Sequence, residues 1–560
     1  MARVDLHENL RNGEQPGSGA PSAYPGRSRF GAAMARYGSA TVAHYVTLLL
    51  GAALLAYMGR AQGFFYDDWA LLVGDADNLV NAPHVGHWSA TPALVFLFLR
   101  NTFGLDSYVP YLALVLVVHL ATVHLLWRIM VRIGVQRWIA VALAVLMMFL
   151  GAGGENIFWA FQFGFVGALA VGLWAIVLID RAPLTPWAGI AVAVLALWAL
   201  TFSGTAIPLV GAAMLVSWAR HGILKTIYVF AAPLLSYAAW YFGPGASYDG
   251  SASQVDGTAT EVLLSTLEYA GHMLVDGLQK LSPIPSLGII LVIALLAWCA
   301  RGRPAFTSRA TPGYALVAAA IVFALLTGFS RAGLGTDNAS SSRYVYLVVA
   351  LVIPAFGMLA TQLAQRGWLR VGGAVAIIGL GIVYNAGILY SEADRQAIQE
   401  EQSRGRLAAA LSLAEDSDGR ISLNEHPVAR WAPDVSVSDL FLFEEEGWIT
   451  DHSFDDQDLL DVGSSMLMEF EPAVQAELSC AVDNDGAIAS LPESDDASFY
   501  LPSGGTVSVF LHAPGMVGLA QDFTLDPGWW TLDNGSTFQA QLSGPAGSLE
   551  TCAPVAATAP

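Results

Sequence analysis

The sequence predicts an α-helical polytopic membrane protein, with about 11 transmembrane helices, that carries a β-rich C-terminal domain outside the membrane. Of its 560 residues, 55% are hydrophobic and 13% are charged, whereas an ordinary soluble domain has about 25% charged residues. Acidic residues are concentrated after the last apolar stretch. Residues 392–560 contain 30 acidic residues and five arginines, a net charge of −25, and the rest of the chain carries +5. A lipid-embedded body is therefore joined to an acidic, water-soluble domain.

Eleven apolar stretches are candidates for membrane spans, each of which needs about 20 apolar residues. Two of them, 138–151 and 187–201, are short, which leaves the count open by one pair. The eleven stretches are 40–59, 108–127, 138–151, 157–179, 187–201, 205–219, 226–243, 284–300, 312–329, 344–364 and 371–390.

The basic residues between these stretches predict the orientation of the chain. They fall in alternate loops, which are all cytoplasmic if the N-terminus is inside, as the positive-inside bias requires. These residues are Arg128, Arg132, Arg137, Arg220, Lys225, Arg301, Arg303, Arg309, Arg366 and Arg370. An odd number of spans then places the acidic C-terminal domain outside. With only two lysines and many arginines, the composition indicates a GC-rich bacterium, so the predicted location is the bacterial cytoplasmic membrane.

Four segments follow from these patterns. Residues 1–38 are polar and rich in Gly, Pro and Ser, which predicts a disordered cytoplasmic segment. Residues 39–391 form the transmembrane body, and 392–419 are predicted to form a helical stalk. Residues 420–560 are predicted to be β-rich, because short strand-like runs occur at Thr506–His512, Gly518–Leu525 and Thr537–Leu542. Cys480 and Cys552 lie in this domain, and a disulfide between them is left open.

The most informative motif is Gly-Phe-Phe-Tyr-Asp-Asp-Trp at 63–69, just after the first span. Paired carboxylates at the mouth of a membrane bundle are costly unless they bind a cation or handle a proton. One of them can accept a proton from a hydroxyl group, while the other raises its pKa, orients the acceptor or holds a divalent cation. The structural alternative is that Asp67 and Asp68 cap a short helix beginning at Trp69.

The Phe-Tyr-Asp-Asp-Trp motif, the long first outward loop at about 60–107 and the span count resemble the GT-C superfamily of polytopic glycosyltransferases. The Asp-Asp form is similar to that of the actinobacterial arabinofuranosyltransferases, and the compact body resembles the mannosyltransferase and aminoarabinose transferase groups. The resemblance does not extend to the C-terminal domain. It implies a GT-C-like body, a polyprenyl-phosphate-linked sugar donor, and a catalytic base at Asp67 or Asp68, of which we favour Asp67.

Basic residues in outward loops run against the positive-inside bias and are therefore candidates for binding the donor phosphate. Arg331 and Arg343 flank the fifth outward loop, and a guanidinium group suits bidentate contacts to phosphate oxygens. The alternative is that they bind lipid headgroups or pair with Asp337. Lys280 ends an amphipathic segment near the same surface and is a weaker candidate.

Residues after Gly154 are candidates for binding the sugar or the acceptor. On a helix, Glu155, Trp159 and Gln162 would share one face, which would combine polar groups with an indole ring. Asn156 and Trp69 are grouped with them, and the alternative for Glu155 is a helix N-terminus stabilised by an acidic residue. Two further groups are unspecific: Glu268, His272 and Asp276 at four-residue spacing, and His84, His87, Asp75 and Asp77 in the first outward loop.

These observations favour an inverting glycosyltransferase that moves a sugar from a polyprenyl-phosphate donor to a glycan, lipid or protein acceptor at the outer membrane face. No cofactor is expected with certainty, although a divalent cation at Asp67 and Asp68 is left open. The alternative is a non-catalytic membrane protein, either a translocase of lipid-linked glycans or a cell-envelope scaffold. Nucleic-acid binding is disfavoured, because neither part of the chain has a basic patch.

Overall fold

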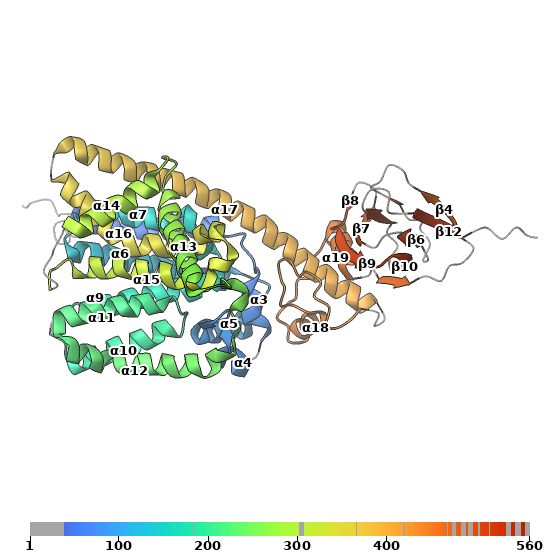
Figure 1. Ribbon diagram of the computed structural model, residues 1–560, viewed down its shortest axis with the longest axis horizontal. Coiled ribbons are helices and arrows are strands. Elements are labelled where there is room, and N and C mark those ends of the chain that lie inside the picture. Colours follow the sequence, from blue (N-terminus) through green and yellow to red (C-terminus); the bar gives the residue numbers. More distant parts are fainter. Residues whose placement is uncertain are drawn as a thin grey trace, which may run out of the picture.

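A computed structural model shows a helical bundle connected by one long helix to a separate β-domain (Figure 1). The structure describes residues 38–466 except 75, 182, 302–306, 366 and 418–420, together with 469–472, 478–482, 489–490, 497–501, 505–513, 516–533, 539–543 and 550–554. The predicted disorder of the N-terminal segment falls on residues 1–37, and so lies outside the described residues, as do Asp75, Arg303 and Arg366.

The body of the protein is built almost entirely of helices. Its α-helices are α2 (Ser39–Met58), α3 (Asp67–Val73), α4 (Ala76–Asn81), α5 (Ala90–Phe103), α6 (Val109–Ile133), α7 (Arg137–Met148), α8 (Glu155–Phe158), α9 (Phe163–Ile179), α10 (Pro186–Leu200), α11 (Ala206–His221), α12 (Ile223–Phe242), α13 (Ala259–Gln279), α14 (Leu287–Arg301), α15 (Thr311–Arg331) and α16 (Ser342–Ala364). Short 3₁₀ turns are η1 (Gly151–Gly153), η2 (Ala160–Gln162), η3 (Pro244–Ser247), η4 (Ser251–Ser253), η5 (Ala332–Leu334) and η6 (Thr336–Ser340), and a two-residue hairpin joins β1 (Pro83–His84) to β2 (His87–Trp88).

Each of the eleven predicted apolar stretches overlaps a helix, although in 157–179 the long helix α9 begins only at Phe163. Seven helices among the described residues are long and apolar enough to cross a membrane, by length and composition. The other four, α7, α10, α11 and α14, have 12 to 16 residues. Large apolar side chains such as Leu49, Leu224 and Phe242 lie exposed on the outside of the bundle, where water would leave them unfavourably solvated. The body therefore has the composition and surface of a helical membrane protein.

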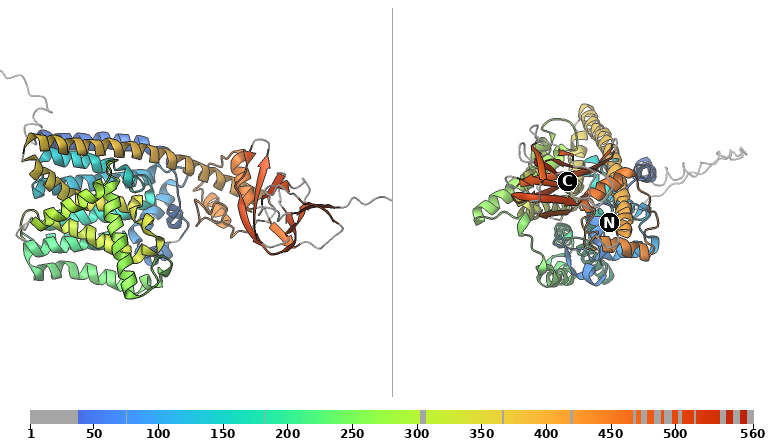
Figure 2. Two further views of the ribbon diagram at one scale, coloured as in Figure 1. Left: turned by 45° about the horizontal axis from the view of Figure 1, so that its top comes forward. Right: turned by 90° about the vertical axis from the view of Figure 1, so that its right-hand side faces the viewer.

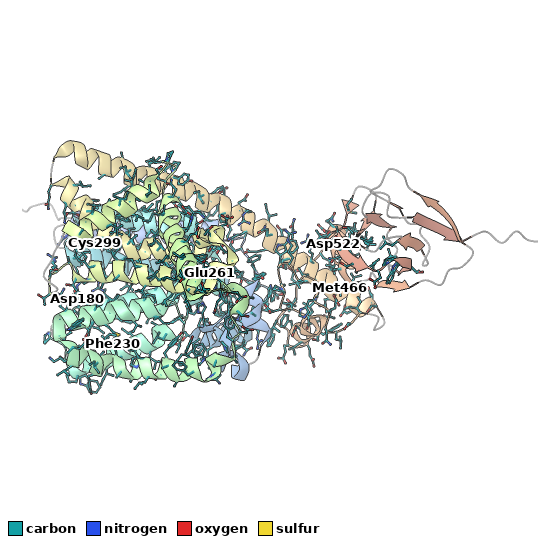
Figure 3. All side chains as sticks on the ribbon, viewed as in Figure 1. Asp180, Phe230, Glu261, Cys299, Met466 and Asp522 are labelled. Atoms are coloured by element: carbon teal, nitrogen blue, oxygen red, sulfur yellow. The ribbon has the colours of Figure 1, made fainter. Side chains whose placement is uncertain are left out.

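Basic loops meet at the end of the bundle that lies far from the β-domain. Asp180 accepts a hydrogen bond from Arg220 at 2.9 Å and lies 3.5 Å from Arg132, while Arg309 donates to the carbonyl oxygen of Arg132. Figure 3 shows Asp180 at this end, opposite Met466 and Asp522. The Asp-Asp motif opens α3, which lies at the other end (Figure 1). The basic loops and the Asp-Asp motif thus lie at opposite ends of the bundle.

The predicted last span and the predicted stalk are one continuous helix, α17 (Trp368–Asp416). At 1.5 Å per residue, its 49 residues extend about 74 Å. The helix runs along the bundle and continues beyond it toward the β-domain (Figure 2). It then packs against α19 (Asp456–Met466), where Arg406 and Asp461 form a buried ion pair. The segment between them contains α18 (Val437–Glu445).

The β-domain consists of two antiparallel sheets. One has the strand order β3-β10-β6-β12-β4, and the other has the order β5-β11-β7-β8 with β9 also paired to β7. Their bounds are β3 (Glu469–Pro472), β4 (Leu478–Val482), β5 (Ala489–Ser490), β6 (Ala497–Leu501), β7 (Gly505–Ala513), β8 (Met516–Val517), β9 (Gln521–Leu525), β10 (Gly528–Asp533), β11 (Gln539–Ser543) and β12 (Glu550–Pro554). Alternate residues Val507, Val509 and Leu511 form a separate apolar core with Leu460 of α19.

The three predicted strand segments each overlap an observed strand, namely β7, β9 and β11. Within the predicted β-rich segment 420–560, α18 and α19 precede the first strand, which begins at Glu469. Both helices contact α17, and the short Pro- and Gly-spaced sequence of this segment does not reveal them.

Candidate functional site

The loop that carries the Asp-Asp motif is held in place by hydrogen bonds to α17 and to the C-terminal segment. The side-chain amide of Gln62 donates to the carbonyl oxygen of Ala393 in α17 at 2.7 Å. The backbone N–H of Tyr66 donates to the carbonyl oxygen of Trp431 at 2.7 Å, and Tyr66 itself has a positive φ of 47°. Few non-glycine residues adopt such a backbone conformation. The stalk and the C-terminal segment therefore determine how the motif is presented.

Asp68 anchors this loop from inside the protein. Its side chain is fully buried and accepts hydrogen bonds from the backbone N–H groups of Phe65 at 3.0 Å and Phe161 at 2.7 Å. Burial nevertheless raises the pKa of Asp68 well above its usual value, and these two N–H groups oppose the rise. The alternative of a helix cap does not describe this arrangement, because α3 begins at Asp67 and not at Trp69, and its N-cap Tyr66 makes no side-chain capping hydrogen bond.

Asp67 has a different environment, although it is the adjacent residue. Its side chain keeps 17% exposure. Burial raises the pKa of Asp67 to about 6, while the positive charges of Arg343 and Arg331 act against this rise. A carboxylate whose pKa lies near the working pH is well suited to accept a proton. Of the two predicted catalytic residues, Asp67 is therefore the partly exposed one, with its pKa raised to about 6.

Two residues beside Asp67 were not distinguished by the sequence. The Nε2 atom of His84 lies 3.8 Å from a carboxylate oxygen of Asp67, and burial lowers the pKa of this histidine. The exposed Asp434 lies close enough to raise the pKa of Asp67 further. Asp434 belongs to the segment after the stalk, and no sequence motif connects it with the Asp-Asp pair.

The predicted phosphate-binding arginines meet at the same end of the bundle. Arg331 is the last residue of α15, and Arg343 lies in the first turn of α16. The Nε atom of Arg343 is buried without a hydrogen-bond partner among the described residues. Glu155 lies near Arg343, whose charge lowers the pKa of Glu155 against the larger effect of burial. Lys280 is exposed and donates to the carbonyl oxygen of Ser340 in the same loop.

The predicted helix face formed by Glu155, Trp159 and Gln162 does not exist. Helix α8 ends at Phe158, Trp159 is extended with φ −85° and ψ 116°, and a 3₁₀ turn follows. Asn156 and Gln162 are fully buried and contact each other at 3.5 Å. Trp159 is 5% exposed and donates from Nε1 to the carbonyl oxygen of Phe65 at 3.0 Å. The buried side chains of this segment therefore pack inside the protein, and Trp159 contacts the Asp-Asp loop through Phe65.

A large groove is lined in part by Arg331. Its volume is about 760 Å³, and it lies between α11, α12 and α15. Arg331 and His87 contribute polar groups, and burial lowers the pKa of His87 to about 4. Exposed aromatic side chains, among them Tyr241, Phe242 and Phe329, line the rest. The groove thus combines a cationic group with a largely apolar wall on the outside of the bundle.

The geometry also bears on the remaining predicted sites. Asp68 is fully buried and each of its carboxylate oxygens accepts a backbone hydrogen bond, whereas Asp67 is partly exposed. No group of three or more metal-binding side chains occurs in the described part of the chain. His272 and Asp276 form an exposed contact at 2.7 Å along α13. Trp69 is 4% exposed and packs against Phe443, away from the arginines.

No known family model, curated protein or solved structure matches this chain.

Proposed function

We propose that the protein is an inverting glycosyltransferase that uses a polyprenyl-phosphate-linked sugar. The observation that carries this proposal is the arrangement around Asp67: a carboxylate with a pKa of about 6 that is influenced by Arg343 and Arg331, the second of which also lines a largely apolar groove. The GT-C superfamily remains the class of enzyme that these features resemble. The sugar, the acceptor and the linkage are not specified by these residues.

In the proposed reaction, the carboxylate of Asp67 removes the proton from an acceptor hydroxyl group. The hydroxyl oxygen forms a bond to the anomeric carbon as the bond from that carbon to the phosphate oxygen breaks. The polyprenyl phosphate leaves with the bonding electron pair. Arg343 and Arg331 supply positive charge where the leaving phosphate gains negative charge, which is the kind of preorganised electrostatic stabilisation that lowers barriers most.

The groove suits the lipid part of such a donor. Its apolar wall is formed by helices whose outer side chains are exposed, and Arg331 is one of the residues that line it. A prenyl chain in the groove would bring its phosphate group toward the arginines.

The proposal also includes the orientation and location of the protein. The arginine-bearing loops indicate that the N-terminus lies in the cytoplasm, and that the site and the β-domain lie outside a bacterial plasma membrane.

The test uses the purified full-length chain in detergent with a panel of polyprenyl-phosphate sugars and glycan, lipid and peptide acceptors. Asp67→Asn removes the proposed base, and Glu268→Gln serves as the matched control, because it neutralises an exposed acid on α13. We expect turnover by the wild type and by the control, and loss of turnover in Asp67→Asn. Equal turnover in all three would exclude Asp67 as the base. Absence of turnover with every donor would favour the non-catalytic translocase or scaffold.

A further inference from the structure

A second cavity, separate from the groove, lies where the bundle, the stalk and the C-terminal segment meet. Its volume is about 300 Å³, at the lower end of the range of small-molecule sites, about 300–1,000 Å³. The loop before α3, Leu105, α17 and the segment after α18 enclose it. Leu407, Leu411 and Ile449 contribute apolar wall.

The buried carboxylate in this cavity has no positive partner. Glu400 is 3% exposed and accepts a hydrogen bond from the backbone N–H of Gly63. Within the described part of the chain, no basic side chain forms an ion pair with it. Burial raises the pKa of Glu400 well above its usual value, because an unpaired charge is unfavourable away from water and buried charges are normally paired. A cationic occupant would supply the missing partner.

Acidic side chains outnumber basic ones at the rim. Asp106, Glu401 and Asp451 line the cavity together with His452 and with Arg404, which is already paired with Asp451. Because acidic groups at the mouth of a low-dielectric cavity attract cations, the field favours a positively charged ligand. A metal ion is disfavoured, since the described residues contain no cluster of three metal-binding side chains.

Two further polar atoms of lining residues are buried without partners. Gln62 Oε1 and Trp69 Nε1 form no hydrogen bond among the described residues, and their side chains are 6% and 4% exposed. A buried polar atom without a hydrogen-bond partner destabilises the folded state unless a ligand or a water molecule supplies that hydrogen bond. The first is an acceptor, which suits an ammonium group, and the second is a donor, which suits a ligand oxygen. The rings of Trp69 and Tyr108 also suit a cation, through their π-faces.

We propose that this cavity binds a small protonated amine that carries an oxygen atom. The ammonium group would lie on Glu400 and Gln62, the oxygen would accept from Trp69 Nε1, and the carbon skeleton would contact the leucines of α17. This site is independent of the proposed transferase activity, because it requires neither the donor groove nor the reacting carboxylate of Asp67.

The test is isothermal titration calorimetry on the full-length chain with three matched ring compounds. These are trans-4-aminocyclohexanol, cyclohexylamine and cyclohexanol, at a pH where the amines are protonated. We expect the aminoalcohol to bind most tightly and the neutral alcohol to bind at least about tenfold more weakly than either amine, a difference of about 1.4 kcal/mol. Equal binding of cyclohexanol, or absence of binding by both amines, would overturn the proposal.

Variants identify the residues responsible. Glu400→Gln keeps an acceptor for Gly63 but removes the charge, and should weaken amine binding by about tenfold or more. Glu401→Gln removes the same charge from an exposed neighbour on the rim, and should change affinity by no more than about threefold. Equal effects of the two would contradict a specific role of Glu400.

A third variant keeps the proposal testable if Glu400→Gln does not fold. Trp69→Phe preserves an aromatic ring but removes the N–H donor. It should abolish the preference for trans-4-aminocyclohexanol over cyclohexylamine and leave cyclohexylamine binding largely intact. An unchanged preference would exclude the donor role of Trp69. Because the readout is heat of binding without any sugar donor, failure here is distinguishable from failure of the transferase proposal.

Discussion

At the scale of single residues, Asp67 and Asp68 show how neighbouring identical side chains acquire different properties. Asp68 points into the protein and bonds to two backbone amides, whereas Asp67 faces His84 and the field of two arginines. Successive residues of a helix project about 100° apart, and in this first turn one direction is the interior and the other is the candidate site. Substitution of Asp67 should therefore affect turnover, whereas substitution of Asp68 should affect stability.

Asp67→Asn should reduce turnover by about 10²–10⁴-fold, the usual contribution of a general base, without a loss of thermal stability. Asp68→Asn should instead destabilise the fold by about 1–3 kcal/mol, because an amide cannot replace both buried acceptor oxygens. Turnover and the thermal unfolding temperature, measured side by side on both variants, check this separation. A large stability loss in Asp67→Asn would contradict it.

The pKa of Asp67 predicts the pH dependence of the reaction. Because the base must be ionised, kcat/KM should fall as the pH drops below about 6, the value to which burial raises this pKa. A pH–rate profile with the same donor and acceptor measures this. A profile that stays flat down to pH 4.5 would argue against Asp67 as the base.

The same shift predicts an effect on stability with a defined sign. Between pH 3.8 and about 6, the folded chain keeps a proton on Asp67 that the unfolded chain has lost, so stability falls as pH rises through this window. Asp67→Asn removes this cost. The stability of the variant relative to the wild type should therefore increase from pH 4 to pH 7, which thermal unfolding at both pH values can check.

At the scale of elements, helix α17 connects the site to the β-domain. Its length allows it to contact the bundle, the Asp-Asp loop through Gln62 and Gly63, and α19 in succession. The contact with α19 includes the buried Arg406–Asp461 pair, whose side chains are 8% and 3% exposed. A nearby exposed pair, Arg404–Asp451, offers a direct comparison.

Asp461→Asn should destabilise the junction by about 3–5 kcal/mol, because it leaves the Arg406 guanidinium buried without its counter-charge. Asp451→Asn should cost no more than about 1 kcal/mol, because solvent screens the exposed pair. Hydrogen exchange across α19 and β7 would measure both. Similar protection in the two variants would show that the buried pair does not hold the β-domain on the stalk.

Strand register answers a question that cysteine spacing left open. In the β4–β12 ladder, Cys480 and Cys552 occupy directly opposite positions. Opposite residues in an antiparallel pair have Cα atoms about 4.5–5.5 Å apart, which is within the range of disulfides. Given an oxidant outside the cytoplasm, we expect a Cys480–Cys552 disulfide, detected by peptide mass spectrometry without reduction. Two free thiols in protein from an oxidising compartment would contradict this.

At the scale of the whole molecule, the two ends of the bundle differ in chemistry. One end gathers Arg132, Arg220 and Arg309 around Asp180, and the other presents the Asp67 site, the stalk cavity and the β-domain. The positive-inside bias assigns the first end to the cytoplasm. Both candidate ligand sites would then be accessible from outside the cell.

This assignment predicts a labelling pattern in intact cells. In a chain whose three native cysteines are replaced by serine, Asp337→Cys should react with a membrane-impermeant maleimide, because residue 337 lies exposed in the loop before Arg343. Arg181→Cys, next to Asp180 and also exposed, should react only after the cells are opened. The reverse pattern would invert the proposed orientation and place the site in the cytoplasm.

The sequence by itself determined the class of the protein, the position of every helix predicted as a span, the helical stalk and the grouping of basic loops. These properties depend on runs of neighbouring residues and on their preference for lipid or water, which composition and periodicity record directly. The Asp-Asp motif also identified the region of the site without structural information.

Only the tertiary structure decided which carboxylate is partly exposed, because this depends on backbone amides of Phe65 and Phe161 and on arginines from two other helices. It likewise removed the predicted helix face at Glu155, and added His84, Asp434 and Glu400 to the residues of interest. Their roles arise from contacts between segments that are distant in the chain. Such contacts set burial and electrostatic field, and neither quantity can be read from local sequence.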